Sequence, residues 1–207
     1  MPLRYIAPAG TPIPFRYLAG SIASALSPRQ VLDEFREAVC SVFGVKHCFF
    51  VSSGRAALTL LVRSLRDMAG EGRDEVVVPS YTCYSVPASI ARAGLRIRVC
   101  DVDPRTLDYD HDKLARTDLS RAVGIVSSNL YGIPNDLQAL SRIAEEQGIF
   151  LVDDAAQCMG GKVNGRASGT FGTAGLFSLD KGKNITSIEG GIVVTGSDDL
   201  SRHFCRW

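Results

Sequence analysis

A chain of 207 residues with 45% hydrophobic and 22% charged residues has the composition of a globular protein, long enough for one α/β domain. Its formal net charge of +1 gives no electrostatic reason to expect a nucleic-acid or anionic-membrane partner. No apolar run approaches the roughly 20 residues of a membrane span, and no apolar segment of a signal peptide follows Met1.

The six cysteines are scattered without a CxxC pair. Several of them, such as Cys48 and Cys100, lie inside apolar runs that are typical of strands. We therefore expect reduced, buried thiols in a cytoplasmic protein, with neither disulfides nor a zinc site. The three histidines fit no metal or catalytic-triad pattern, so no metal is expected.

The start of the chain changes from irregular to periodic near Ser27. Residues 1–19 are rich in proline and glycine and are predicted to form an irregular arm. Ser27 and Pro28 are typical of a helix start, with serine at the N-cap and proline in the first turn. Apolar residues then recur at helical spacing, which predicts a helix that ends at Gly44.

From Lys46 onward, continuous apolar runs that predict buried strands alternate with amphipathic segments that predict helices. The predicted strands are 46–51, 76–78, 97–100, 123–126, 149–152, a run beginning at 175, and 192–195. The predicted helices are 54–68, 86–93, 110–114 and 136–146. This alternation predicts an α/β fold, a mostly parallel sheet with helices on both faces, in a single domain over residues 1–207.

Two polar segments that follow predicted strands carry the most informative chemistry. The first is a turn with Lys181 and Lys183 that leads into Glu189-Gly190-Gly191, and the second is Asp153–Gln157, about thirty residues upstream. An isolated turn lysine is usually a solvated surface residue. A lysine after one strand and an aspartate at the end of another are, however, the parts of a pyridoxal-phosphate (PLP) site. The lysine forms a Schiff base, and the aspartate keeps the pyridine nitrogen protonated.

The order of these segments resembles the DegT/DnrJ/EryC1/StrS family of PLP-dependent sugar aminotransferases. The shared features are Asp153–Gln157, Phe177-Ser178-Leu179, Lys183 five residues after Ser178, and Glu189-Gly190-Gly191 six residues after the lysine. The resemblance implies the large domain of the fold-type-I aspartate aminotransferase superfamily and PLP as cofactor. It also implies an amino-acid donor, expected to be glutamate, and a keto-sugar acceptor linked to a nucleotide.

The resemblance assigns the Schiff-base role to Lys183, because Lys181 does not fit the spacing. It places Asp154 against the pyridine nitrogen, since the acid is followed by Ala-Ala-Gln. The residues alone leave the pair Asp153 and Asp154 ambiguous, because either could cap the next helix. Gln157 is expected near the phenolic oxygen of the cofactor.

The turn Ser53-Gly54-Arg55 joins a predicted strand to a predicted helix, whose first amides and dipole favour an anion such as the cofactor phosphate. Such glycine turns also occur for steric reasons alone. The family usually has Gly-Thr here, so Arg55 could bind the phosphate or point away. Ser178 is the second phosphate ligand that the resemblance implies.

The segment 79–86 matches the part of the family that stacks an aromatic ring on the cofactor. The aromatic position is Cys83 here, so stacking could pass to Tyr81 or Tyr84 or be replaced by a thiol contact. The loop that begins at Asn129, where the family often has histidine, is equally well an active-site loop or a turn with a buried tyrosine. All these segments follow strand carboxyl ends, where open α/β sheets bind ligands.

The resemblance covers only the first part of the family pattern, because family members continue into a small C-terminal domain. Two hypotheses therefore stand. The chain is a PLP aminotransferase acting as a homodimer, or a truncated or split non-catalytic subunit that pairs with a complementing C-terminal chain. Family dehydratases replace the lysine with histidine, so Lys183 favours amino transfer.

Overall fold

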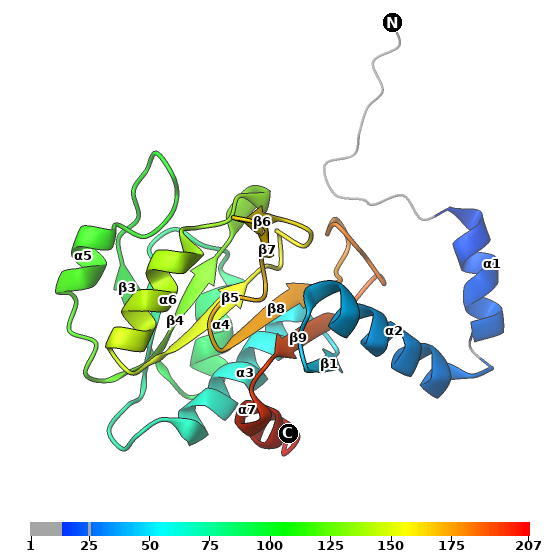
Figure 1. Ribbon diagram of the computed structural model, residues 1–207, viewed down its shortest axis with the longest axis horizontal. Coiled ribbons are helices and arrows are strands. Elements are labelled where there is room, and N and C mark those ends of the chain that lie inside the picture. Colours follow the sequence, from blue (N-terminus) through cyan, green and yellow to red (C-terminus); the bar gives the residue numbers. More distant parts are fainter. Residues whose placement is uncertain (1–13, 25) are drawn as a thin grey trace, which may run out of the picture.

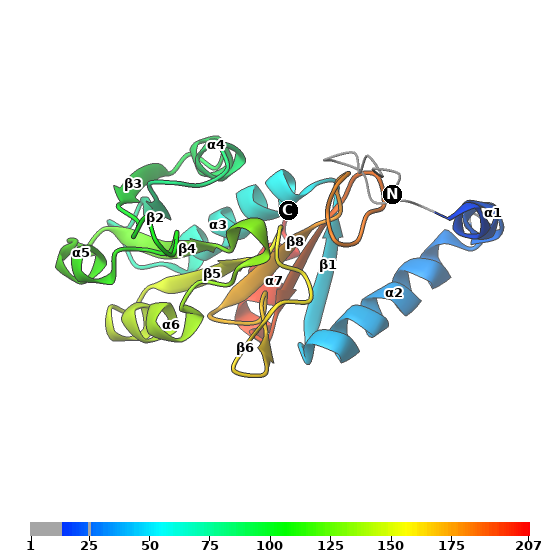
Figure 2. The same ribbon diagram turned by 90° about the horizontal axis from the view of Figure 1, so that it is seen from above.

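The computed structural model describes residues 14–24 and 26–207. A central seven-stranded sheet is covered by helices on both faces, and a small separate hairpin lies at one side (Figures 1 and 2). Across the sheet the strands are β1 (His47–Val51), β9 (Gly191–Thr195), β8 (Ala174–Ser178), β5 (Phe150–Asp154), β4 (Ala122–Ser128), β2 (Glu75–Pro79) and β3 (Arg96–Cys100).

The helices and the small hairpin complete the layers around this sheet. The helices are α1 (Phe15–Ser24), α2 (Pro28–Phe43), α3 (Gly54–Met68), α4 (Ser85–Arg92), α5 (His111–Arg116), α6 (Leu137–Glu146), α7 (Asp198–Phe204) and the 3₁₀ turn η1 (Leu130–Gly132). The hairpin pairs β6 (Lys162–Val163) with β7 (Arg166–Ala167).

Every strand of the sheet except β9 runs in the same direction. The pairs β2–β3, β2–β4, β4–β5 and β5–β8 are parallel, whereas β9 is antiparallel to both β8 and β1. The predicted α/β fold with a mostly parallel sheet is therefore confirmed. As a consequence, the carboxyl ends of β1, β2, β4, β5 and β8 lie at one end of the sheet, beside the start of β9.

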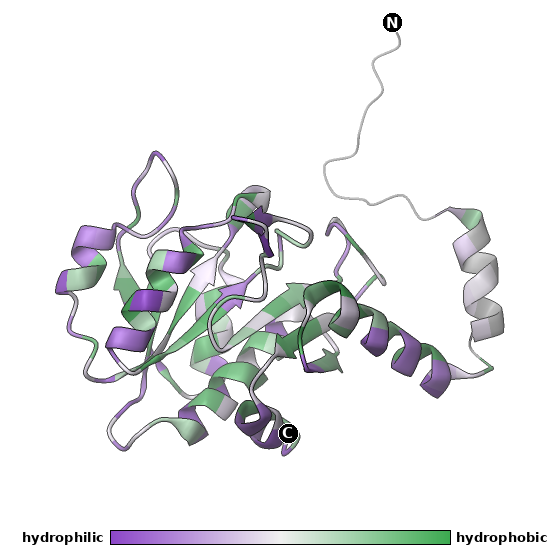
Figure 3. Cartoon of the chain, in the orientation of Figure 1, coloured by the Kyte–Doolittle hydropathy of each residue, from purple (hydrophilic) through white to green (hydrophobic). Residues whose placement is uncertain are grey.

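The two faces of the sheet bury separate apolar clusters. Helices α3, α4 and α7 cover one face, and Leu61 and Ile90 pack there with strand residues such as Val126. Helices α2, α5 and α6 cover the other face, where Leu137 packs with Ile125. Apolar residues follow the strands and the inward stripes of the helices, while polar residues lie on the outward helix faces (Figure 3). This distribution is the physical basis of the alternating pattern in the sequence.

The predicted helix over 28–43 is present, and its end has a clear cause. Gly44 adopts φ 64°, a left-handed conformation in which its N–H caps the helix by bonding Cys40 O. Ser27 lies at the N-cap but makes no side-chain capping bond. The predicted buried strand at 46–51 is instead the edge strand β1, in which only Cys48 is buried, because β1 has a neighbouring strand on one side alone.

The prediction of an irregular arm over 1–19 is wrong from Phe15 onward, and residues 1–13 lie outside the described part of the chain. Helix α1 occupies Phe15–Ser24, directly after Pro14, and extends away from the sheet (Figure 1). Proline is tolerated at a helix start, so Pro14 can stand directly before α1 without interrupting it.

All six cysteines are free thiols. Cys48, Cys100 and Cys158 are buried, as expected for apolar strand and core positions, whereas Cys83 and Cys205 are exposed, contrary to the expectation of burial. Within the described residues, no helix is both long enough and apolar enough to cross a membrane.

Candidate active site

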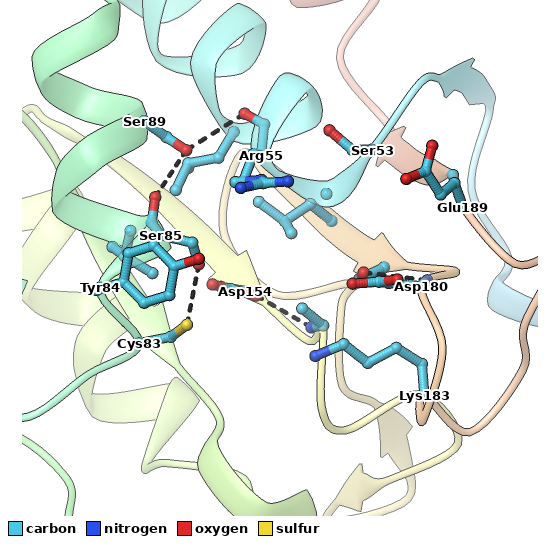
Figure 4. Close-up of a pocket in the computed structure, with 17 residues that line it drawn as sticks. Ser53, Arg55, Cys83, Tyr84, Ser85, Ser89, Asp154, Asp180, Lys183 and Glu189 are labelled. Atoms are coloured by element: carbon cyan, nitrogen blue, oxygen red, sulfur yellow. Dashed lines mark hydrogen bonds between the residues drawn. The ribbon is translucent and has the colours of Figure 1, made fainter. Parts of the chain in front are cut away.

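A cavity of about 280 Å³ opens at the carboxyl end of the strands, between the start of α3, the loop before α4 and the loop that joins β8 to β9 (Figure 4). A smaller cavity of about 50 Å³ adjoins it and shares part of its wall. The fold brings all eight sequence-predicted residues here: Ser53, Gly54, Arg55, Cys83, Asp154, Ser178 and Lys183 line the larger cavity, and Gln157 lines the smaller one.

Lys183 belongs to the polar loop between β8 and β9. The loop is closed at its base by a hydrogen bond from Leu179 N to Gly190 O (2.9 Å), and Lys183 N donates to Asp180 O (3.1 Å). Asn184 Nδ2 ties the loop to the rest of the site by donating to Met159 O (2.9 Å). Figure 4 shows the lysine side chain reaching into the cavity toward Asp154. Lys181 lines neither cavity.

Asp154 is the last residue of β5, and its carboxylate faces the cavity. The residue is only 9% exposed, and Oδ1 accepts a hydrogen bond from Ala156 N at 3.0 Å. Burial raises the pKa of Asp154 to about 6, although the Ala156 bond and the charge of Lys183 act in the opposite direction. A buried carboxylate in this state would be stabilised by a cationic partner in the cavity.

Asp153 points to the opposite side of β5, because successive side chains of a strand alternate between faces. Its carboxylate accepts hydrogen bonds from Asn129 Nδ2 (2.7 Å), Gly169 N (2.6 Å) and Phe171 N (3.2 Å). Burial raises the pKa of Asp153 to about 6 against these bonds. The structure therefore separates the pair: Asp153 holds the loop before β8, and Asp154 faces the cavity.

The start of α3 forms the other end of the cavity. Ser53 is its N-cap, with Oγ accepting from Ala56 N (3.1 Å). A Cβ on Gly54 would lie 3.0 Å from Ser178 Cβ, and one on Gly191 would collide with the carbonyl of Ser53. Glycine at positions 54 and 191 therefore allows the turn, β8 and β9 to meet closely.

Several hydrogen-bond donors at the α3 end of the cavity have no acceptor in the described part of the chain. The amides of Gly54 and Arg55 donate to no group in the described part of the chain. Ser178 is 8% exposed and accepts a long bond from Asp180 N (3.4 Å), but its own hydrogen meets no acceptor among the described residues. The donor set fits a phosphate group, while Lys183 and Asp154 offer the amine and the carboxylate that a pyridine aldehyde requires.

The sequence left three candidates for the group that would lie against the cofactor ring: Cys83, Tyr81 and Tyr84. Cys83 lines both cavities, and its Sγ accepts a hydrogen bond from Ser85 Oγ (3.1 Å). Tyr84 also lines the larger cavity. Tyr81 lines neither, because its hydroxyl pairs with that of Tyr131 at 2.7 Å. Cys83 and Tyr84 are thus the two candidates that the cavity retains.

The loop that begins at Asn129 braces the site. Asn129 Nδ2 donates to Asp153 Oδ1 (2.7 Å) and to Asp154 O (2.9 Å), and the residue also borders the smaller cavity. Gln157 Oε1 accepts from Tyr131 N at 3.1 Å. Of the two interpretations of this loop that the sequence left open, a turn with a buried tyrosine is wrong, because Tyr131 is 66% exposed. Its backbone adopts φ 58°.

Four polar residues of the wall were given no role from the sequence: Ser85, Ser89, Asp180 and Glu189. Asp180 and Glu189 flank Lys183 in the same polar loop, so their position between two apolar strands was an available signal. Ser85 begins α4 and lies inside the segment 79–86 that was predicted to stack on the cofactor. Across the described residues, no group of three or more His, Cys, Asp or Glu side chains could hold a metal ion.

The fold and the cavity together define a class: an α/β domain whose parallel strands end at a cavity lined by a lysine, a buried carboxylate and hydrogen-bond donors that fit pyridoxal phosphate. The model of the DegT/DnrJ/EryC1/StrS aminotransferase family matches residues 24–206, and the chain belongs to this family. Enzymes of this family use pyridoxal phosphate.

Curated relatives include both aminotransferases and dehydratases. The chain is 38% identical over 168 residues to L-glutamine:2-deoxy-scyllo-inosose aminotransferase of Micromonospora echinospora, covering 81% of this chain and 39% of that protein. It is 33% identical over 172 residues to GDP-4-keto-6-deoxy-D-mannose 3-dehydratase of Yersinia pseudotuberculosis, covering 82% and 44%. The chain thus spans less than half the length of these relatives.

Solved structures of the same kinds of protein resemble this chain in fold over about half of their own length. DesI, solved in the presence of its TDP-sugar product, superposes with a TM-score of 0.85 at 30% identity, over 97% of this chain and 51% of DesI. The dehydratase of E. coli, GDP-4-keto-6-deoxy-D-mannose-3-dehydratase with bound hydrated PLP, gives a TM-score of 0.83 at 26% identity, over 94% and 52%.

Proposed function

We propose that this chain is the cofactor-binding part of a PLP-dependent aminotransferase that moves an amino group from glutamate to a keto group of a nucleotide-linked sugar. The observation that carries the proposal is the meeting of Lys183 and Asp154 in one cavity that ends in the donor-rich start of α3. Lys183 lies in the loop between β8 and β9 and Asp154 at the end of β5, so the fold, and not proximity in the sequence, brings the lysine to a buried carboxylate.

The residues of the chain divide the work of such a site. When bound, pyridoxal phosphate supplies an electron sink for the bonds of the donor carbon. Lys183 would hold the cofactor through its amine, and the same amine would move the proton at the donor carbon. Asp154 holds a proton on the ring nitrogen, and Ser53, Gly54 and Ser178 bind the phosphate. Gln157 lies beside the position proposed for the phenolic oxygen.

Sugar-linked substrates are supported by the named relatives. GDP-perosamine synthase of Vibrio cholerae, 32% identical over 167 residues, is named for a nucleotide-linked sugar, and DesI was solved in the presence of its TDP-sugar product. Since relatives also include dehydratases, the choice between the two reactions falls on Lys183, whose amine suits a transaminase. The donor of the M. echinospora relative is named as glutamine, which makes glutamine the competing donor to test.

The proposal is tested by the release of keto acid from the full chain loaded with pyridoxal phosphate. We expect stoichiometric 2-oxoglutarate from glutamate in the wild-type chain and in Lys181→Ala, but none in Lys183→Ala. Glutamine is assayed in parallel through its own keto acid. If the loaded chain releases keto acid from neither donor, amino transfer by this chain is contradicted, and the non-catalytic subunit is the better description.

A further inference from the structure

The buried side chain of Asn129 joins the end of β5 to the loop that follows β4. Asn129 is 2% exposed. Its Nδ2 donates to Asp153 Oδ1 (2.7 Å) and to Asp154 O (2.9 Å), and its Oδ1 accepts from Asn135 N (3.0 Å). Both amide hydrogens are therefore engaged. Although Asn129 borders the smaller cavity, its amide has no hydrogen left to donate to a ligand, so it acts through its neighbours.

The main-chain carbonyl of Asp154 is held twice by this one residue. Asn129 N donates to Asp154 O at 3.1 Å, in addition to the bond from Nδ2. These bonds continue the parallel pairing of β4 with β5 just past its last matched residues, Ser128 and Asp154. Two donors on one carbonyl fix the peptide group that follows Asp154. They thereby restrict the rotation of the residue whose carboxylate faces the cavity.

The same amide also holds the neighbouring acid on the opposite face of β5. The carboxylate of Asp153 is fully buried and accepts from Gly169 N and Phe171 N as well as from Asn129 Nδ2. Among these three donors, Asn129 is the one that also bonds Asp154. Because successive side chains of a strand alternate between its faces, holding Asp153 on its own side keeps Asp154 on the cavity side.

We propose that Asn129 is a positioning residue for the amino transfer: it fixes the end of β5 so that the Asp154 carboxylate faces the ring nitrogen of the cofactor. This inference rests on the proposed function, because it requires a pyridine ring in the cavity. Without the Asn129 side chain, Asp154 keeps its place in the strand but is free to turn. The loss is therefore felt at the ring nitrogen.

The experiment measures the affinity of the full chain for deoxypyridoxine phosphate by calorimetry. This analogue of the cofactor keeps the ring nitrogen and the phosphate but carries a methyl group in place of the aldehyde, so it forms no bond to Lys183. We expect Asn129→Ala to weaken binding by about 10-fold. In a chain that already carries Asp154→Asn, the same change should have little effect, because the carboxylate that Asn129 positions is absent.

Asn135→Ala is the matched control. It removes another buried amide of the same network, whose Nδ2 donates to Ser127 Oγ (3.1 Å), and it keeps the backbone N–H that bonds Asn129. We expect this variant to bind the analogue as the wild type does, even where urea denaturation shows a loss of stability equal to that of Asn129→Ala. Asn129→Ser, which keeps one hydroxyl to donate, is the milder second variant and should bind with intermediate affinity.

Three results would overturn the inference. Asn129→Ala and Asn135→Ala could weaken binding equally, folded Asn129→Ala and Asn129→Ser could bind as tightly as the wild type, or Asn129→Ala could weaken binding by the same factor with and without Asp154→Asn. Circular dichroism establishes that each variant is folded. Failure of pyridoxal phosphate to attach at Lys183 would contradict the proposed function alone, because the analogue cannot bond to the lysine.

Discussion

At the scale of single residues, the site depends on which face of a strand each side chain occupies. Asp153 and Asp154 are neighbours with raised pKa values from the same cause, burial, yet they do different work. The carboxylate of Asp153 accepts three hydrogen bonds, two from the loop before β8 and one from Asn129 Nδ2, while that of Asp154 accepts a single bond from Ala156 N. A carboxylate with few partners in a buried position costs stability unless a ligand compensates it.

Because burial of the ionised Asp154 costs stability, we expect the free energy of unfolding to depend on pH. The pKa of Asp154 is about 6 in the folded chain against an ordinary value of 3.8, so its ionisation destabilises the fold as pH rises through this window. Asp154→Asn should therefore be more stable than the wild type above about pH 6, by on the order of 3 kcal/mol, with the difference vanishing near pH 4. Urea denaturation at a series of pH values measures it. A difference that does not change with pH would mean that Asp154 ionises in its ordinary range.

The reactivity of the Cys83 thiol can show whether the cavity is occupied. It and Cys205 are the two exposed thiols, and only Cys83 lines the cavity. We expect iodoacetamide to alkylate both in the free chain, and pyridoxal phosphate to protect Cys83 while Cys205 stays reactive. Mass spectrometry of the digested chain gives both rates. Equal rates at Cys83 with and without the cofactor would place the bound ring away from this wall.

At the scale of elements, the site is built from close approaches between a turn and two strands. The turn before α3 meets β8 at Ser178 and β9 at Gly191. A Cβ on Gly54 would be in tight contact with Ser178, and one on Gly191 would collide with the Ser53 carbonyl. The approach positions the α3 amides beside the base of the loop that carries Lys183. Changes at this junction should therefore affect the fold and the cavity together.

Gly191→Ala tests the junction. Its methyl group would collide with the Ser53 carbonyl, which belongs to the backbone and cannot move aside cheaply. We expect a loss of about 1–3 kcal/mol in the free energy of unfolding, together with weaker phosphate binding. Gly196→Ala, at the far end of β9, meets nothing within 4 Å and is the control. If both variants unfold at the same urea concentration, the close approach is not a constraint.

At the scale of the whole molecule, the elements of the sheet could be predicted because buried parallel strands are continuous apolar runs and their helices are amphipathic. The same topology gathers the strand carboxyl ends, which is why eight residues scattered over the sequence border two adjoining cavities. Patterns of this kind report burial, and burial determines most of this fold.

Features that depend on local backbone geometry could not be predicted from the hydrophobic pattern of the sequence. The strands β6 and β7 have two residues each, too few for any periodicity. The residues left open which member of the Asp153–Asp154 pair faces the cavity, because both end the same strand and only the register of β5 separates them. The residues also left open whether the loop at Asn129 is an active-site loop or a turn with a buried tyrosine, and Tyr131 is exposed, with a left-handed backbone.

The most direct test of the account is to locate the cofactor on the chain. The full chain is incubated with pyridoxal phosphate, the lysine–cofactor bond is fixed with borohydride, and the digest is analysed by mass spectrometry. We predict one modified residue, Lys183, with the modification lost in Lys183→Ala and kept in Lys181→Ala. Modification at Lys181, or spread over surface lysines to the same extent in Lys183→Ala, would contradict the assignment of this cavity as the cofactor site.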